Sequence, residues 1–458
     1  MQCFTIMACA SMPAASMAQA GALPPVPMDL KFDFSAGATK ARYTRVAPNA
    51  TYTYEAGYGY EPGAQMAQGD DDSTTTSDEP FLFSAQVPEG NFNVTVTFGD
   101  SRQETTTTVK AESGRLTLER VRVPAGQVVE RTFTVNARTP ILPKLPTNAP
   151  GRDAVSLDMF DRANARDWDN KLTIEIVSPH AALRTIEIAS APQAPTVFIA
   201  GDSTVTDRDS RGDVSWGQLL PRFFKPGVAV SNDAQSGETL KSFANALRLD
   251  KILSQMKKGD YLFMQFGHND SKDSWPQTYV EPETTYKAYL KVYIAEARLR
   301  GATPVLVTPM DRGVRGTGAP THGHGGYPQA MREVALEEHV PLIDLYNMSI
   351  AFYENAGADS AKILADGTHS TAYGGYEFAK CIVMGIKQNK LDLANFIDFD
   401  PAHPDSAAAL NLDGLFDSGG AGLGMREGAN GAPAVGTPDS GPSANPPAGS
   451  ANPGPGPL

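Results

Sequence analysis

The sequence is short of cysteine, which excludes a fold held together by disulfide bonds. Only three cysteines occur in 458 residues, and two of them, Cys3 and Cys9, stand close to the N-terminus. If that segment is removed on secretion, Cys381 has no intramolecular partner. Cys381 lies in an apolar stretch with helical spacing, which favours a small buried side chain over a reactive thiol.

Basic charge and long apolar runs are also scarce. Lys and Arg number 39 against 52 Asp and Glu, which gives a net charge of −13. Because no basic stripe is present to neutralise phosphates, we expect no nucleic-acid partner, and the acidic charge also argues against an anionic membrane surface. No apolar run approaches the roughly 18 residues of a membrane-spanning helix, so no membrane insertion is expected either.

Residues 1–20 are predicted to be a signal peptide, which would make the protein secreted or periplasmic. They are small and apolar, and Ala18–Ala20 reads Ala-Gln-Ala, a small-x-small cleavage site. The basic residues that usually open such a segment are absent. A lipoprotein signal at Cys9 is an alternative, although Ile6-Met7-Ala8 is a poor sequence to precede a lipidated cysteine.

Residues 28–190 are predicted to form an N-terminal β-sandwich domain. Apolar and polar residues alternate in short runs, as in residues 81–98, and Gly, Pro and Asn separate these runs. Thr and Val are abundant within them. Such a pattern is typical of an all-β antiparallel sandwich or jelly roll.

After a linker at 190–195 the periodicity changes, and residues 195–398 are predicted to be an α/β domain. Helical patterns separate five apolar runs, which favours a three-layer α/β/α domain with a five-stranded parallel sheet. Ligands bind such sheets at the carboxyl ends of the strands. Residues 399–458 are rich in Gly, Pro and Ala and are predicted to be a disordered tail. The five runs begin at Thr196, Val228, Tyr261, Thr303 and Val340.

Polar residues that could take part in catalysis stand at the ends of these runs. Ser203 follows the first strand in Gly-Asp-Ser-Thr, where the glycine allows a sharp turn that presents the serine at the start of a helix. Capping of that helix by Ser203 or Asp202 is a common alternative. Asn269 follows the third strand and either donates to an oxyanion or closes the strand in an Asx turn. Asp366 and His369, three residues apart, can orient and supply a general base, although a surface histidine is the usual alternative.

Together these residues resemble the SGNH (GDSL-type) hydrolases, and within them the rhamnogalacturonan acetylesterases. The resemblance covers roughly residues 195–390. Glu238 departs from the pattern, because the subfamily often has Arg at that position. The four blocks are GDSTV at 201–205, SNDAQSGETLKSF around Gly237, QFGHND at 265–270 and DGTHSTAYGG at 366–375.

The resemblance implies a role for each matched residue. Ser203 would be the nucleophile, with His369 as general base and Asp366 as its orienting partner. The N–H groups of Ser203 and Gly237 and the side-chain amide of Asn269 would form the oxyanion hole. No cofactor and no metal are implied.

The function that the resemblance implies is a secreted carbohydrate esterase. It would remove O-acetyl groups from plant cell-wall polysaccharide, above all pectic rhamnogalacturonan. Separately from the resemblance, we expect a monomer. An acetylxylan esterase and a general short-chain carboxylesterase are alternatives with the same chemistry. A glycan-binding protein in which the β-sandwich dominates is an alternative of a different class.

Two pairs of residues near the fourth strand have less specific interpretations. Arg312 and Arg315 follow that strand and are candidates to bind uronate carboxylates of the acetylated polysaccharide, although a solvated loop is the alternative. His322 and His324 form a His-x-His motif, but the sequence offers no third ligand at a suitable spacing, so no metal site is expected.

The N-terminal domain weakly resembles the galactose-binding-like sandwiches that accompany such esterases. Its tyrosine-rich stretch could bind glycan or could pack as alternating strand residues. We expect packing for at least half of the four side chains. They are Tyr52, Tyr54, Tyr58 and Tyr60.

Overall fold

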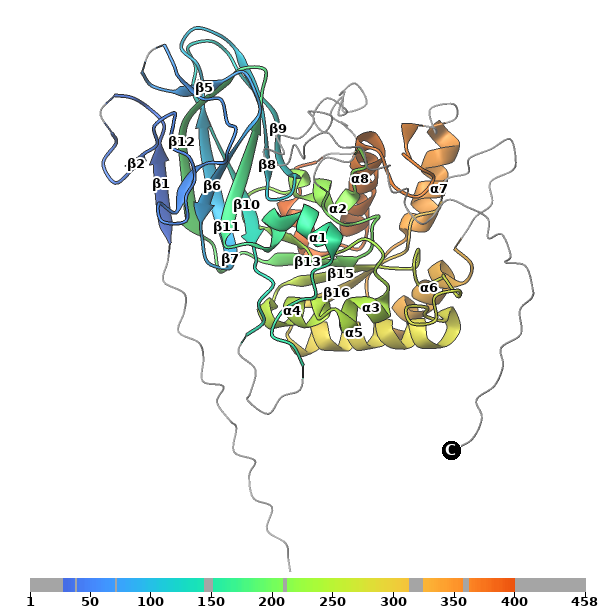
Figure 1. Cartoon of the computed structure of the whole chain (residues 1–458). Coiled ribbons are helices and arrows are strands. Elements are labelled where there is room, and N and C mark those ends of the chain that lie inside the picture. Colours follow the sequence, from blue (N-terminus) through green and yellow to red (C-terminus); the bar gives the residue numbers. More distant parts are fainter. Residues whose placement is uncertain are drawn as a thin grey trace, which may run out of the picture. The chain divides into compact units, whose positions relative to one another are not determined.

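The computed structural model describes most of the chain between Met28 and Phe399 (Figure 1). The predicted signal peptide, Cys3, Cys9, Arg315, His322 and the tail beyond Phe399 lie outside the described residues. All described residues belong to one compact unit. Residues 28–190 are called the N-terminal region, and residues 195–399 the C-terminal region. The described residues are 28–37, 39–70, 72–143, 151–208, 212–312, 324–356 and 362–399.

Two sheets make up most of the N-terminal region (Figure 1). The first contains β1 (Asp29–Asp33), β2 (Thr44–Arg45), β4 (Ala67–Gln68), β5 (Thr75–Ser77), β7 (Gly90–Phe98), β10 (Val129–Ala137) and β12 (Ala181–Ser190). Its main path runs β10–β7–β12–β1–β2, and β5 pairs with both β12 and β4. The second contains β3 (Tyr58–Tyr60), β6 (Phe81–Gln86), β8 (Thr105–Ala111), β9 (Arg115–Val123) and β11 (Lys171–Val177), in the order β3–β6–β11–β8–β9. Neighbouring strands are antiparallel, except that β1 and β2 are parallel.

Both sheets contribute to one hydrophobic core, because alternate residues of their strands are buried. Val94 and Val96 of β7 are fully buried, and they belong to the same cluster as Phe81 and Phe83 of β6. The alternation in the sequence therefore located this core correctly. The finer assignment to the jelly-roll or galactose-binding-like class stays a prediction.

Two of the four tyrosines pack, as expected. Tyr60 is 3% exposed, and the ring of Tyr58 lies 5.1 Å from that of Phe32. Tyr54 is 67% exposed and is available to solvent.

A short helical segment, which the sequence pattern did not predict, interrupts the strands of the N-terminal region, and the assignment of this region as an all-β domain stays a prediction. Residues 156–170, which we call the crossover, lie between β10 and β11 and contain α1 (Met159–Ala163) and the 3-10 helix η1 (Ala165–Trp168). Asp158 accepts hydrogen bonds from the N–H groups of Phe160 and Asp161, and the Asp161 carboxylate accepts the N–H of Asp158 in return. This reciprocal capping is a local signal that a search for alternating strands does not detect.

The C-terminal region has the predicted five-stranded parallel sheet, in the order β14–β13–β15–β16–β17. Its strands lie within the apolar runs of the sequence because both faces of the sheet are covered. They are β13 (Thr196–Gly201), β14 (Ala229–Asn232), β15 (Tyr261–Gln265), β16 (Thr303–Val307) and β17 (Leu342–Ile343).

Helices connect these strands (Figure 1). Among the described residues, no helix is long and apolar enough to cross a membrane. The α-helices are α2 (Trp216–Leu219), α3 (Leu240–Asn245), α4 (Arg248–Gln255), α5 (Lys287–Leu299), α6 (Tyr327–Glu338), α7 (Leu345–Ala356) and α8 (Ala372–Gln388). Shorter turns are the 3-10 helices η2 (Leu220–Phe223) and η5 (Asp392–Phe396) and the π-helix η3 (Pro282–Tyr286).

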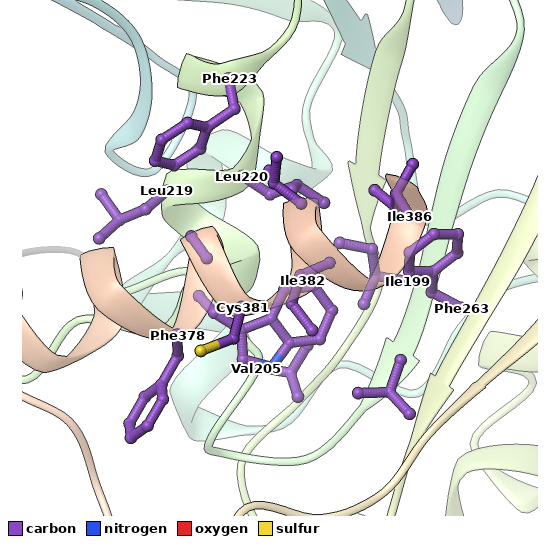
Figure 2. Close-up of a cluster of buried hydrophobic side chains, with 14 of the residues drawn as sticks. Ile199, Val205, Leu219, Leu220, Phe223, Phe263, Phe378, Cys381, Ile382 and Ile386 are labelled. Carbon is purple, nitrogen blue, oxygen red and sulfur yellow. The ribbon is translucent and has the colours of Figure 1, made fainter. Parts of the chain in front are cut away.

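Successive residues of β13 belong to different hydrophobic clusters, one on each face of the sheet, because side chains alternate across a strand. Ile199 packs in a cluster with residues of α2, η2 and α8, and Figure 2 shows it beside Phe263, Ile382 and Ile386. Phe198 belongs to a second cluster, with residues of α3 to α6. Cys381 lies in the first cluster and is 7% exposed, which confirms the burial expected from its spacing.

Two helical features differ from the sequence pattern. The helical spacing over residues 239–258 is continuous in the sequence and indicates one helix, but the structure has two, because Leu247 adopts a left-handed conformation with φ 64° between α3 and α4. The apolar spacing continues across this break and conceals it. The helix α7 was not predicted, since it buries only Leu345 and Ser349 and its apolar periodicity is weak.

Candidate active site

The sequence-predicted site residues come from the carboxyl ends of the parallel strands. Ser203 follows β13, Gly237 follows β14 and Asn269 follows β15, while His369 precedes α8. Parallel strands that are neighbours in a sheet present these ends at one edge. The topology therefore brings together residues that are far apart in the sequence.

Ser203, His369 and Asp366 form a continuous chain of hydrogen bonds. Nε2 of His369 lies 2.9 Å from Oγ of Ser203, and Nδ1 of His369 lies 2.6 Å from Oδ2 of Asp366. The other oxygen of Asp366 accepts the backbone N–H groups of Thr368 and His369, at 2.9 and 2.8 Å. This arrangement can move a proton from the hydroxyl to the imidazole.

Asp366 is held in its ionised form. Partial burial works against the charge, but the hydrogen bonds from His369 and Thr368 outweigh it and lower the pKa of Asp366 to about 2. A negative carboxylate beside Nδ1 favours a proton on that nitrogen. Nε2 is then left as the acceptor that faces Ser203.

The turn at Ser203 is capped by Asp202 rather than by the serine. The Asp202 carboxylate accepts the N–H and the hydroxyl of Thr204, at 2.9 and 2.7 Å. The expectation that a helix starts at Ser203 was wrong, because the chain makes a turn there and the next helix, α2, begins at Trp216. The Ser203 hydroxyl is thus left to interact with His369.

Asn269 lies next to the loop that carries Gly237. Its side-chain N–H donates to the carbonyl of Glu238 at 3.1 Å, and only 5% of the residue is exposed. Gly237 has a φ of 83°, in the left-handed region where glycine is favoured. Asn269 and the Gly237 loop are therefore neighbours, as the oxyanion hole implied by the resemblance requires.

Glu238, which departs from the family pattern, points inward. Its carboxylate accepts a hydrogen bond from the Ser242 hydroxyl and lies 3.8 Å from the guanidinium of Arg248. Burial raises the pKa of Glu238 even though Arg248 opposes the shift. The side chain is 13% exposed and is therefore largely occupied with internal contacts.

Asp202 and Asp270 have the contacts of anchoring residues. Asp202 lies 3.3 Å from Nδ1 of His268, and although burial opposes its charge, His268 and Thr204 lower the pKa of Asp202 to about 2. Asp270 accepts the N–H groups of Leu240 and Gly267, at 3.0 and 2.9 Å, while burial raises its pKa to about 7. These bonds tie the segment around Asn269 to β13 and α3.

Arg312 and His324 both contact His268. The guanidinium of Arg312 donates to the His268 carbonyl at 3.1 Å, and the ring centroids of His268 and His324 are 4.3 Å apart. Burial lowers the pKa of His324 to about 2. Among the described residues, no group of three or more His, Cys, Asp and Glu side chains could hold a metal ion.

Sequence reasoning missed the residues that the N-terminal region contributes beside the site. Asp158 accepts a hydrogen bond from the Gln235 side chain at 2.9 Å, and Asp161 pairs with Arg248. The Asp-x-x-Asp capping pattern could have revealed the helix, but nothing local indicates its partners.

Comparison with known proteins gives consistent results. A family model described as "GDSL-like Lipase/Acylhydrolase family" matches residues 199–375. The probable rhamnogalacturonan acetylesterase YesY of Bacillus subtilis (strain 168) is 40% identical over 209 residues, which are 44% of this chain and 96% of YesY. The rhamnogalacturonan acetylesterase RhgT of the same organism is 35% identical over 220 residues, 44% of this chain and 93% of RhgT. The uncharacterized esterase YxiM, also of that organism, is 25% identical over 383 residues, 79% of this chain and 91% of YxiM.

Proposed function

The chain belongs to the GDSL-like lipase/acylhydrolase family and is a carboxylic-ester hydrolase, and from this premise we propose that it removes O-acetyl groups from pectic rhamnogalacturonan. The observation that carries the proposal is the hydrogen-bonded chain from Ser203 through His369 to Asp366. The substrate class rests on the named relatives, which are rhamnogalacturonan acetylesterases. The coarser assignment, a carbohydrate esterase, follows from the same relatives.

The proposed mechanism has two stages that share the same residues. Oγ of Ser203 attacks the acetyl carbonyl while Nε2 of His369 accepts the hydroxyl proton. The carbonyl oxygen becomes an oxyanion, which accepts hydrogen bonds from the N–H groups of Ser203 and Gly237 and from the amide of Asn269. When the tetrahedral intermediate collapses, the C–O bond to the sugar breaks and His369 returns the proton to the sugar oxygen.

Water completes the cycle by the same route. His369 takes a proton from a water molecule, whose oxygen attacks the acetyl carbonyl on Ser203. The second intermediate collapses, acetate leaves and the serine regains its proton from His369. Asp366 stays ionised throughout and stabilises the imidazolium that forms in each half of the cycle.

We propose that the protein acts outside the cytoplasm, as the apolar segment at residues 1–20 indicates. Polymeric cell-wall substrate is found there. When the full-length chain is expressed, detection of a protein with its N-terminus near Ala20 in the culture medium or periplasm would support this location. An intact N-terminus at Met1 in the cytoplasm would contradict it.

Acetate release from a panel of acetylated polysaccharides tests the proposed function. The panel contains rhamnogalacturonan, xylan and mannan. Hydrolysis of p-nitrophenyl acetate measures ester cleavage without any contribution from polysaccharide binding. We expect the highest kcat/KM on rhamnogalacturonan, whereas a preference for xylan would assign the protein to the acetylxylan esterases. Ser203→Ala should abolish hydrolysis of every ester, while Ser254→Ala, at an exposed position of α4, should leave it unchanged. Full activity of purified Ser203→Ala would refute the mechanism.

A further inference from the structure

The loop that carries Gly237, residues 233–238, joins β14 to α3 without a helix or strand of its own. Toward the parallel sheet, the N–H groups of Asp233 and Gln235 donate to carbonyls at the end of β13, at 3.0 and 3.1 Å. Further contacts of the loop come from side chains. Two of the residues that contact it, Asp158 and Arg138, belong to the N-terminal region.

Arg248, the first residue of α4, connects this loop to the crossover. The residue is 1% exposed. Its Nη1 donates to the carbonyl of Asp233 at 3.1 Å, and its Nε lies 3.8 Å from the Glu238 carboxylate. Its Nη2 donates to both carboxylate oxygens of Asp161, at 2.6 and 2.5 Å. One guanidinium thus contacts both ends of the Gly237 loop and a helix of the N-terminal region.

Trp168 of the crossover contacts two arginines that hold this loop. Its ring centroid lies 5.4 Å from the guanidinium of Arg248 and 4.3 Å from that of Arg138. Arg138 follows β10 and donates to the carbonyl of Asn232 at 2.6 Å, and its Nε lies 3.3 Å from the Asp233 carboxylate. Trp168 is only 7% exposed, so these cation–π contacts are shielded from water. Cation–π contacts are stronger when they are desolvated in this way.

Asp158 acts closer to Gly237, through Gln235. The side-chain N–H of Gln235 donates to Asp158 at 2.9 Å, and the side-chain oxygen of Gln235 accepts the backbone N–H of Ser236 at 2.6 Å. The amide of Gln235 is therefore fixed at one end by the crossover and fixes the peptide before Ser236 at the other. The next N–H group along the chain is that of Gly237, the expected oxyanion donor.

We propose that Asp158, Asp161 and Trp168 are positioning residues for the oxyanion hole. The crossover of the N-terminal region holds residues 233–238 so that the N–H of Gly237 is aimed at the reacting carbonyl. This inference rests on the proposed ester hydrolysis at Ser203. It gives the N-terminal region a part in the chemistry that does not depend on binding glycan.

Two variants of the full-length chain separate positioning from general stability. Asp161→Asn removes the charge that pairs with Arg248. Asp158→Ser retains a good helix cap, but its side chain is too short to reach Gln235. Misplacement of catalytic groups by about 1 Å costs on the order of 10² in rate, so we expect each variant to lower kcat on p-nitrophenyl acetate by about 10- to 100-fold. KM should change by less than about threefold, because the oxyanion forms only in the transition state.

Glu119→Gln is the matched control. Glu119 of β9 pairs with Arg222 at 2.7 Å and accepts a hydrogen bond from Tyr376, so it also joins the two regions, but through η2 and α8. We expect this variant to lower Tm as much as the crossover variants do, and to retain its kcat. Asp161→Glu should recover part of the lost kcat by restoring the charge.

The outcomes distinguish the two proposals. If Ser203→Ala is inactive while Asp158→Ser and Asp161→Asn keep kcat within about twofold of the unmodified protein, positioning by the crossover is refuted and the proposed hydrolysis stands. If Asp158→Ser, Asp161→Asn and the control Glu119→Gln all lose kcat in proportion to their loss of Tm, the crossover acts through stability alone. The inference is then refuted as well. If Asp161→Asn does not fold, Asp158→Ser decides, since its side chain is at the surface.

Discussion

Nδ1 of His268 lies 3.3 Å from Oδ2 of Asp202, and both residues are buried, at 1% and 0% exposure. Asp202 also accepts two hydrogen bonds from Thr204, so the pair supports the turn that presents Ser203. The buried pair therefore links the end of β15 to the turn that contains Ser203, the proposed nucleophile.

Asp202→Asn should destabilise the fold in a pH-dependent way. The substitution removes the charge of a buried carboxylate that accepts two hydrogen bonds from Thr204, and hydrogen bonds to a charged group contribute about 1.5–3 kcal/mol each. Because the pKa of Asp202 is lowered from 3.8 to about 2 in the folded protein, its stabilising effect is present above 3.8 and is lost as the pH falls toward 2. Urea unfolding at pH 6 and pH 3 measures the free energy of unfolding of both proteins. The variant should fall further below the unmodified protein at pH 6 than at pH 3. Asp273→Asn, at an exposed position, serves as control; a difference that grows toward acid pH would contradict the prediction.

Asn269→Ala should lower kcat with little change in KM. Loss of one oxyanion donor costs about 10²–10³ in kcat, since the bond is made chiefly in the transition state. Steady-state kinetics on p-nitrophenyl acetate measure both constants. Asn347→Ala, on α7 and exposed, should behave as the unmodified protein does. A variant at Asn269 with normal kcat would remove this side chain from the proposed oxyanion hole.

Arg312→Ala should raise KM for acetylated rhamnogalacturonan by about tenfold, the cost of a lost charged hydrogen bond to a uronate. The KM for p-nitrophenyl acetate should stay the same, because that ester has no carboxylate. Arg131→Ala changes the net charge equally at an exposed position of β10 and serves as control. An equal increase in KM for both substrates would contradict uronate binding and would mean that Arg312 acts only through its hydrogen bond to the His268 carbonyl.

Trp275→Ala should weaken binding of polymeric substrate alone. Trp275 is 38% exposed and lies in the turn that follows Asn269, where the N–H of Lys272 donates to the Asn269 carbonyl at 3.0 Å. An exposed aromatic ring beside a polysaccharide site provides apolar area for a sugar face. We expect a KM increase of about three- to tenfold on rhamnogalacturonan, from the loss of about 1 kcal/mol of aromatic contact, and none on p-nitrophenyl acetate. Tyr54→Ala, in the N-terminal region, is the control, and an equal increase there would contradict a local role for Trp275.

The sequence predicted those features that depend on local patterns. The five parallel strands lie in continuous apolar runs, and Ser203, Asn269 and His369 stand at the ends of such runs or before a helix. The break at Leu247 and the helix α7 were missed because apolar spacing continues through the first and is weak in the second. The contacts of Asp161 and Trp168 were also missed. Their partner, Arg248, is distant in the chain, and local periodicity carries no record of such pairings.

The linker at 190–195 separates two patterns in the sequence, but a side chain from before the linker belongs to a core that lies after it. Leu116 of β9 is fully buried within the cluster that contains Ile199 and the helix α8, and Arg115 beside it pairs with Asp207 at 2.9 Å. A shortened chain that begins at Pro195 would therefore lose part of its own interior. For protein engineering, the two regions are best treated as a single folding unit, and grafting either one onto another scaffold would require redesign of the surface it leaves behind.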